Sequence, residues 1–176
     1  MASYVDVSWS ALGSRSPPKL TSGLRCRVGP NWPNGGEIDI FEGVNDGRQN
    51  QMTLHTSAGC TLSTPMAASG SIRDLNCDAF ASSNNLGCGV QDPSVRSFGE
   101  GLNSAGGGVW VTHISATDGI RVWFFLRDNI PDDIASGDPR FQNWGTPRAS
   151  FAADTCDIEK FFPPQTIVLN TTICGE

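Results

Sequence analysis

The sequence predicts an all-β protein in which two sheets pack as a jelly-roll sandwich. No segment keeps a 3.6-residue apolar period for long, so we expect little helix. The 176 residues include 20 glycines and 11 prolines, which favours many short strands joined by turns. Several short runs of apolar and alternating residues supply the strands.

The first hairpin is predicted from residues 36–43 and 49–56. The second run alternates polar and apolar side chains, as a strand with one buried face does. Residues 45–48, Asn-Asp-Gly-Arg, form a good four-residue loop between the two runs. In this arrangement Met52 and Leu54 point into the core.

Three acids, Glu37, Asp39 and Glu42, interrupt the first of these strands. Strict alternation places Glu37 and Asp39 on one face and Glu42 on the opposite face. A β-bulge at Ile40 or Phe41 would turn Glu42 back onto the face of the other two acids. Because carboxylates are costly to bury, their grouping predicts a cleft that uses them, and the bulge is expected on that premise.

The bulge would determine how the two strands of the hairpin pair. One skipped residue in the first strand brings each acid opposite a polar residue of the second strand. The expected pairs are Glu37 with His55, Asp39 with Thr53, and Glu42 with Gln51.

Later strands are predicted from the remaining apolar runs. A second hairpin is expected where three glycines at 106–108 lead into a strand and Asp118-Gly119 turns the chain. Pro163 and Pro164 are compatible only with an edge or with the start of a strand. The strands are expected over residues 109–114 and 120–126, around Phe151, and over 166–169.

Two glutamates on one face with an aspartate between them match the needs of glycoside hydrolysis. One carboxylate attacks the anomeric carbon, and the other, kept protonated, gives its proton to the leaving oxygen. The charge of Asp39 would push the pKa values of Glu37 and Glu42 apart. Spacing alone leaves retention and inversion both open. A solvated strand face or a site for a hard cation is the alternative interpretation of the same acids.

The run Gly-Glu-Ile-Asp-Ile-Phe-Glu at 36–42 resembles the catalytic signature of glycoside hydrolase family 16 in its bulged form. The longer pattern is similar to the secreted fungal endo-β-1,3(4)-glucanases, or laminarinases, of that family. It extends from about Val28 to the C-terminus and includes residues 28–37, 43–45, 50–56, 118–120, 122–125, 144–147 and 171–175. The resemblance implies a concanavalin-like jelly-roll β-sandwich, here a partial one.

The resemblance also implies roles for individual residues. It makes Glu37 the nucleophile, Asp39 the residue that tunes it, and Glu42 the general acid/base of a double displacement with retention. It matches His55 to a cleft histidine and Trp32 to an aromatic residue that lines the sugar site.

The residues themselves support these last two assignments less strongly. Trp32 lies in the turn-forming stretch 30–36, where a surface platform for a sugar and a structural position under a loop are both open. A lone histidine is more often a partly buried structural residue, so the predicted place of His55 opposite Glu37 is what favours a role in the site.

Two further positions bear on the site. We expect Gln51, opposite Glu42, to contact substrate. His113 and Ile114 stand where the family usually has Glu-Trp, so the sequence departs from the family in that strand. His113 is therefore assigned to a strand and given no role.

Composition restricts the partners. The formal net charge of −6 and a pI near 4.8 argue against nucleic acid or anionic membrane, whose binding needs basic patches. No apolar run approaches the length needed to span a bilayer. We expect a monomer that binds neutral β-glucan polysaccharide without a cofactor or a metal ion.

The cysteines bear on location. Six cysteines favour an oxidising compartment, although they allow fifteen pairings that sequence does not distinguish. Asn170 opens the sequon Asn-Thr-Thr, which makes it a candidate for glycosylation. No charged start followed by an apolar segment marks a signal peptide in this chain. We expect an extracellular or cell-wall location for the full-length parent protein.

The chain divides by charge at Val28. Residues 1–27 hold four basic residues and one acid, and residues 28–176 hold eight basic residues and seventeen acids. The predicted division is an unmatched N-terminal segment, disordered or foreign, followed over 28–176 by a partial catalytic domain that is truncated at both ends. If Cys26 belongs to the foreign part, one of the other cysteines lacks its partner.

Three functions are compatible with the sequence. The first is a retaining endo-β-1,3(4)-glucanase, and the second is a β-glucan-binding protein without catalysis, since jelly rolls also serve as lectins. The presence of both glutamates favours the enzyme, because a lectin does not need them. The third is a cell-wall glucan transglycosylase, in which a sugar instead of water resolves the intermediate.

Overall fold

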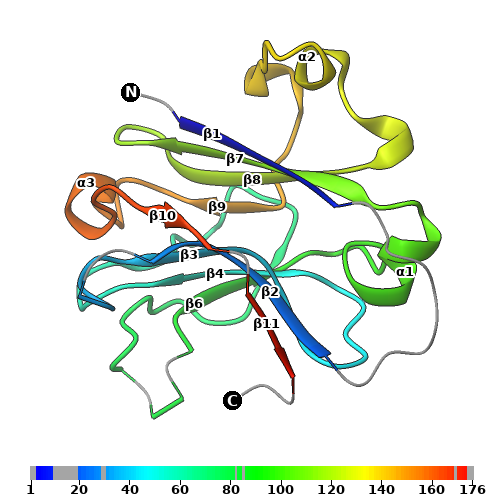
Figure 1. The fold of residues 1–176 in the computed structure, drawn as a ribbon. Helices are drawn as coiled ribbons and strands as arrows, with labels where there is room; N and C mark the ends of the chain where they lie inside the picture. Colours follow the sequence, from blue (N-terminus) through cyan, green and yellow to red (C-terminus); the bar gives the residue numbers. More distant parts are fainter. Residues whose placement is uncertain are drawn as a thin grey trace.

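The structure, a computed structural model, describes residues 3–9, 20–28, 31–81, 83–84, 86–168 and 170–173. Two antiparallel sheets lie one above the other and form a β-sandwich (Figure 1). This architecture confirms the predicted all-β class.

The smaller sheet has four strands in the order β1-β7-β8-β9. Its centre is the second predicted hairpin, in which Ser115 pairs with Gly119 across the turn. The strands are β1 (Ser3–Trp9), β7 (Gly108–Ser115), β8 (Gly119–Leu126) and β9 (Ala149–Phe151).

The larger sheet has seven strands, with β10-β2-β3-β4-β6-β5 in order and β11 paired to β2. The predicted strand over 166–169 is observed as the two residues of β10, and Leu169 lies outside the described residues. The strands are β2 (Leu20–Val28), β3 (Glu37–Gly43), β4 (Gln51–His55), β5 (Ser71–Ile72), β6 (Cys88–Gln91), β10 (Thr166–Ile167) and β11 (Asn170–Ile173).

The described part of the chain contains little helix, as predicted, and no helix there is long and apolar enough to cross a membrane. They are α1 (Gly99–Ser104), α2 (Asp132–Ala135) and α3 (Ile158–Phe161), with 3-10 turns η1 (Arg127–Asn129) and η2 (Phe141–Asn143).

The N-terminal strands take part in both sheets. The backbone of β1 pairs with β7 from Ser3 to Trp9, and β2 pairs with β3. These pairings give residues 3–9 and 20–28 defined places in the fold, whereas the predicted separate origin of residues 1–27 stays a prediction.

Aromatic rings fill the space between the sheets. Trp110 on β7 stacks on Phe124 of β8 at 4.5 Å between ring centroids. On the facing sheet, Phe41 of β3 lies 4.6 Å from Trp110 and 4.9 Å from Phe98. The predicted core residues Met52 and Leu54 are fully buried. The core therefore ties β3, the strand that carries the three acids, to the opposite sheet.

Within the described residues, two disulfides connect loops of the sandwich. Cys60 is bonded to Cys156, and Cys77 is bonded to Cys88 at the start of β6. The side chains of the remaining two cysteines, 26 and 174, lie outside the described residues.

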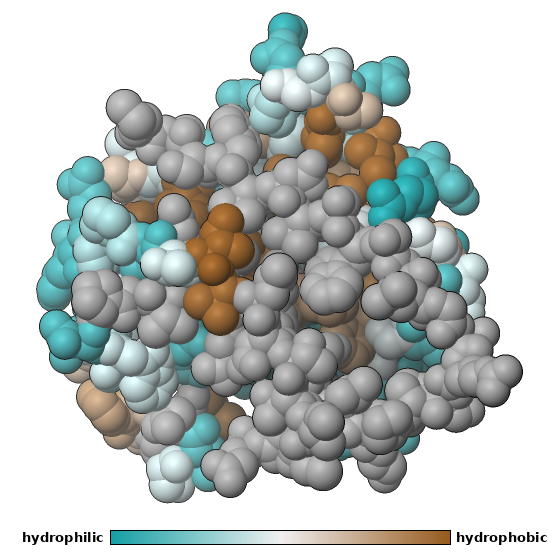
Figure 2. Space-filling view, viewed as in Figure 1, coloured by the Kyte–Doolittle hydropathy of each residue, from teal (hydrophilic) through white to brown (hydrophobic). Residues whose placement is uncertain are grey.

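The segment that follows β8 folds back over the smaller sheet. Phe141 stacks on His113 with ring centroids 4.1 Å apart, and Trp144 meets Trp123 edge-on with ring centroids 5.4 Å apart. Figure 2 shows hydrophobic side chains gathered beneath the hydrophilic residues at the top of the molecule, where Figure 1 places α2. This second, smaller apolar cluster anchors the α2 segment to the sheet.

Candidate active site

The three acids share one face of β3, because the strand contains the predicted bulge. Glu37 pairs with His55 and Asp39 with Thr53, and after a register shift Glu42 pairs with Gln51. This is the predicted register in full. The loop before β4 is longer than predicted, since β3 ends at Gly43 and β4 begins at Gln51.

Asn50 holds the bulge in place. Its side-chain oxygen accepts a hydrogen bond from the Glu42 N–H at 2.9 Å, and its amide nitrogen donates to the Ile40 carbonyl at 2.8 Å. Asn50 is fully buried, and its own N–H donates to the Ser97 hydroxyl at 2.9 Å. One side chain thus satisfies the two backbone groups that the bulge removes from the strand pairing. Sequence analysis missed this residue.

Glu37 is buried, with 2% of its surface exposed. The indole N–H of Trp32 donates to its Oε2 at 2.6 Å. Trp32 comes from the turn that precedes β3 and is itself 38% exposed. A short hydrogen bond of this kind fixes the orientation of the carboxylate.

Asp39 and His55 form a pair beside Glu37. His55 Nε2 lies 3.3 Å from Asp39 Oδ2. Burial raises the pKa of Asp39 to about 7 and the charges of Glu37 and Glu42 add to this, although the His55 hydrogen bond opposes it. Burial by itself would lower the pKa of His55, but the hydrogen bond to Asp39 and the charges of the three acids outweigh it and raise that pKa. Both groups of the pair therefore hold their protons more tightly than the same side chains do in water.

Glu42 lies in a more open environment than the other two acids. It is half-buried, and its Oε2 accepts a hydrogen bond from the Thr53 hydroxyl at 3.1 Å. Gln51 donates to the same hydroxyl at 3.1 Å, so it reaches Glu42 through Thr53. Thr53 is a further site residue that sequence analysis placed opposite Asp39 without giving it a role.

The polar face continues across β6 and β5. Strand pairing places Gln91 opposite Gln51 and Gly89 opposite Thr53, on the face of the acids. Arg73 follows β5 and makes a short contact with Gln91. Gly89 has no side chain to cover this part of the polar face, and a Cβ there would lie 3.4 Å from the Gln51 amide nitrogen.

An aromatic rim borders the other side. Phe80 is 67% exposed and meets Trp32 edge-on, with ring centroids 6.2 Å apart. The Cys77–Cys88 disulfide ties the loop that carries Phe80 to β6. Phe80 was not predicted, because its contact with Trp32 joins segments far apart in the sequence.

The cation interpretation has a geometric basis. Ligand atoms of Glu37, Asp39 and His55 all lie within 4.8 Å of one another. Each of the three already has a partner: Trp32 for Glu37, and each other for Asp39 and His55. A metal ion would have to displace these contacts, so the observed bonding favours carboxylate chemistry.

Two remaining positions lie apart from this face. His113 is buried on β7, with Nε2 3.4 Å from Asp118 Oδ2 and its ring against Phe141, which agrees with the strand assignment. Asn170 lies on β11, where its backbone pairs with Gly23. Its side chain lies outside the described residues, and its glycosylation stays a prediction.

Comparison with known families supports the resemblance. Residues 26–176 match a model described as the XgeA-like, catalytic GH16 domain. The chain belongs to the GH16 family of glycoside hydrolases. The match covers β3 and β4 and therefore includes all three acids.

Two curated relatives of this GH16 chain come from fungi. A probable glycosidase of Schizosaccharomyces pombe is 48% identical over 151 residues, which make up 85% of this chain and 36% of that protein. An endo-1,3(4)-β-glucanase of Arthroderma benhamiae is 41% identical over 147 residues, covering 82% of this chain and 32% of that protein. The GH16 chain thus spans about a third of the length of these relatives.

Solved structures agree with the fold. GH16 laminarinase 16A from Phanerochaete chrysosporium, which holds two β-glucans in its donor and acceptor sites, superimposes with a TM-score of 0.87 at 38% identity. The alignment covers 99% of this chain and 58% of that one. An elongating GH16 β-1,3-glucosyltransferase superimposes with a TM-score of 0.80, also at 38% identity, covering 90% of this chain and 51% of that one. These matches confirm the predicted jelly-roll sandwich and the laminarinase resemblance.

Proposed function

We propose that this GH16 domain hydrolyses internal bonds of β-1,3-glucan and mixed β-1,3/1,4-glucan by double displacement with retention. The observation that carries the proposal is the bulge in β3, which places Glu42 on the face of Glu37 and Asp39. Without the bulge, Glu42 would point to the opposite face and the pair of glutamates would not exist.

In the first step, Glu37 attacks the anomeric carbon and forms a glycosyl-enzyme ester. The Trp32 indole N–H donates to Oε2 of Glu37 and orients the carboxylate for this attack. Glu42 gives its proton to the departing glycosidic oxygen, which leaves with the released part of the glucan. The Thr53 hydroxyl fixes the orientation of Glu42.

In the second step, Glu42 removes a proton from water, and the resulting attack on the anomeric carbon releases Glu37. Asp39 and His55 lie between these groups and adjust the local charge. As Glu37 loses its charge in the ester, the repulsion that helps to raise the pKa of Asp39 falls. The pair can therefore hold its proton differently in the two steps.

Two substitutions test these roles. We expect Glu37→Gln to abolish hydrolysis of laminarin, measured by reducing-sugar release. Glu42→Gln should be partly rescued on substrates with activated leaving groups, which do not need a proton donor. Hydrolysis that persists in Glu37→Gln would remove the proposed mechanism.

A transglycosylase is the second candidate, since a solved relative is described as an elongating β-1,3-glucosyltransferase. The same two glutamates would act, with a sugar hydroxyl replacing water in the second step. Product lengths distinguish the two: hydrolysis yields only fragments shorter than the starting oligosaccharide, and transfer also yields longer chains.

We further propose that the parent protein acts outside the cell or in the cell wall. Disulfides persist in oxidising compartments, and the described residues contain two. The protein is expected to act as a monomer, which the mass measured by light scattering would test.

A further inference from the structure

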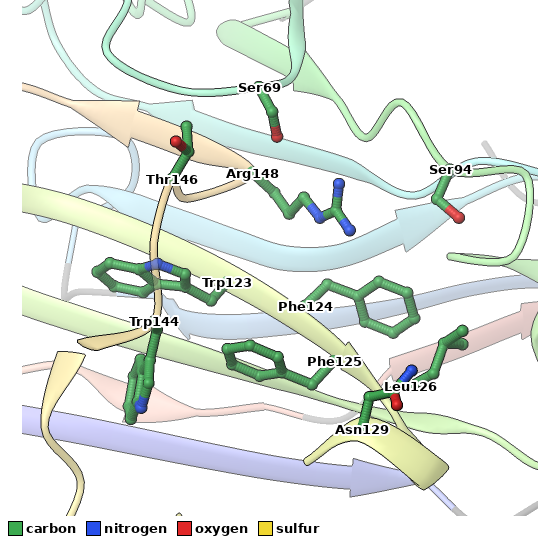
Figure 3. A pocket seen from close by; sticks show the side chains of 10 residues that line it. All are labelled: Ser69, Ser94, Trp123, Phe124, Phe125, Leu126, Asn129, Trp144, Thr146 and Arg148. Atoms are coloured by element: carbon green, nitrogen blue, oxygen red, sulfur yellow. The ribbon is translucent and has the colours of Figure 1, made fainter. Parts of the chain in front are cut away.

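A pocket of about 370 Å³ lies beside the end of β8. None of its lining residues belongs to the carboxylate face, which is the face of β3 and β4 that carries Glu37, Asp39 and Glu42. Side chains from β8 form one wall, and the other comes from segments next to β5, β6 and β9 (Figure 3). Small-molecule pockets typically measure about 300–1,000 Å³, so this one has room for a single small ligand unit.

The apolar wall is aromatic and firmly held. Trp144 meets two rings edge-on, with its ring centroid 5.4 Å from that of Trp123 and 5.8 Å from that of Phe125. The indole N–H of Trp144 donates to Asp133, and that of Trp123 donates to the Gly145 carbonyl at 3.0 Å. Because both indoles are anchored within the protein, the rings present their apolar surface without further ordering on binding.

The opposite wall is polar, and several of its side-chain groups make no hydrogen bond within the described part of the protein. Arg148 reaches into the pocket between Ser69 and Ser94 (Figure 3). Among the described residues, the terminal nitrogens of Arg148 and the side chain of Thr146 have no hydrogen-bond partner. The same holds for the side chain of Asn129, which lies beside Leu126 at the end of β8 (Figure 3). These groups offer donors and acceptors together, which suits a ligand that carries several hydroxyls.

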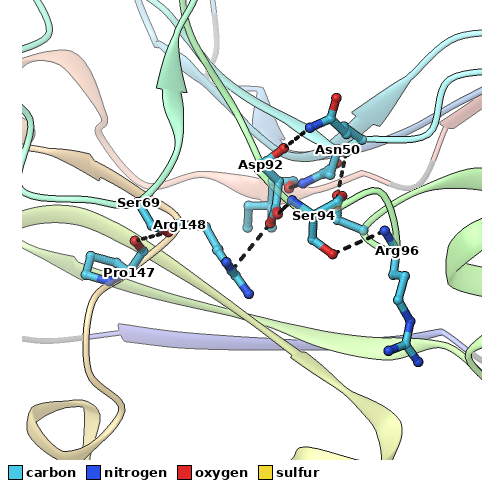
Figure 4. A network of polar contacts seen from close by, with 10 residues as sticks. Asn50, Ser69, Asp92, Ser94, Arg96, Pro147 and Arg148 are labelled. Carbon is cyan, nitrogen blue, oxygen red and sulfur yellow. Dashed lines mark hydrogen bonds and ion pairs between the residues drawn. The ribbon is translucent and has the colours of Figure 1, made fainter.

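The buried carboxyl group of Asp92 lies beside Arg148 and balances its charge. Asp92 is fully buried, and its Oδ2 lies 3.7 Å from Arg148 Nε without making a hydrogen bond (Figure 4). Its other oxygen accepts from the Ser94 N–H at 2.8 Å. Among the described residues that line the pocket, Arg148 alone is charged. An anion would face the buried carboxylate, so the pocket favours a neutral ligand.

We propose that this pocket is a second carbohydrate-binding site, which holds one neutral sugar residue of a glucan chain apart from the carboxylate face. The apolar face of the sugar packs on Trp144 and Phe125. Its hydroxyls bond to Arg148, Thr146 and Asn129. A glucan chain held here would remain near the domain between reaction cycles, which raises its effective concentration at the carboxylates.

Titration of the ¹⁵N-labelled protein with a β-1,3-glucan trisaccharide tests the site. Glu37→Gln in all samples prevents turnover, and the indole N–H signals of Trp32 and Trp144 report the two sites separately. We expect saturable shifts at both. Arg148→Met should weaken the affinity read at Trp144 at least tenfold and leave that read at Trp32 unchanged. Arg96→Met is the matched control, since Arg96 is exposed and points away from Arg148 (Figure 4).

Three results would overturn the proposal. The Trp144 signal could stay fixed at sugar concentrations that saturate Trp32, its affinity could be the same in Arg148→Met, or sodium phosphate alone could reproduce its shift. If Arg148→Met does not fold, Thr146→Val takes its place, with an expected loss of about threefold. The Trp144 readout does not depend on hydrolysis, so the result stands whether or not the proposed function is correct.

Discussion

Removal of the Asn50 side chain should damage the site through the bulge. In Asn50→Ala the buried Ile40 carbonyl and the Glu42 N–H both lose their partner. A buried unsatisfied polar group costs about 1–3 kcal/mol, and the half-buried Glu42 N–H can regain water at the lower end of that range. We therefore expect a loss of roughly 2–4 kcal/mol in the free energy of unfolding.

Activity should fall further than stability alone explains. A domain of ordinary stability, about 5–15 kcal/mol, stays folded after such a loss. A free bulge lets Glu42 move relative to Glu37, and a displacement of about 1 Å can lower a rate roughly 100-fold. We predict a drop of that order in kcat on laminarin, with folding checked by urea denaturation.

Two matched variants sharpen this test. Asn50→Asp keeps the acceptor for the Glu42 N–H but loses the donor to Ile40 and buries a carboxylate against that carbonyl, so its defects should be at least as large as those of Asn50→Ala. Asn103→Ala, at an exposed position on α1, should change neither quantity. Wild-type kcat in a folded Asn50→Ala would refute the view that this side chain positions Glu42.

Three other predictions concern the same face. Because the pKa of Asp39 is raised to about 7 in the folded state, ionisation of Asp39 lowers the stability of the wild type progressively from about pH 4 to pH 7. Asp39→Asn should therefore be increasingly more stable than the wild type across that range in urea melts. The acid limb of its pH–rate profile should also shift. Equal pH dependence in both proteins would leave Asp39 a structural residue only. Phe80→Ala should raise KM for laminarin about threefold to tenfold with kcat little changed, if the exposed ring extends the Trp32 platform; an unchanged KM excludes that. Arg73→Met should raise KM for long glucans and not for short oligosaccharides, since Arg73 follows β5, which lies three strands, or about 14 Å, from β3. Equal effects on both substrates would contradict an outer binding position for Arg73.

Local pattern was enough to predict the hairpin that carries the acids. Alternation in β4 determined which side chains face the core, and the requirement that three carboxylates share one face located the bulge. Both are properties of adjacent residues, so they can be read from one short stretch of sequence.

Contacts between distant segments could not be predicted in this way. Asn50 supports the bulge from the loop before β4, and that loop is longer than its turn residues indicated. Phe80 reaches Trp32 from a loop that the Cys77–Cys88 disulfide joins to β6. The pocket around Arg148 combines side chains from residue 69 to residue 148, which only the packed sandwich brings together.

The central claim is that Glu37 forms a covalent bond with the sugar. A 2-deoxy-2-fluoro glycoside of laminaribiose with an activated leaving group slows the second step, so the glycosyl-enzyme should accumulate and can be mapped by peptide mass spectrometry. The account predicts one added 2-deoxy-2-fluoro-laminaribiosyl group, which is two sugar residues, on the peptide that contains Glu37, with fragment ions that assign it to that residue, and no labelling of Glu37→Gln. A label on Glu42 or Asp39, or hydrolysis that releases the inverted anomer without any label, would contradict it.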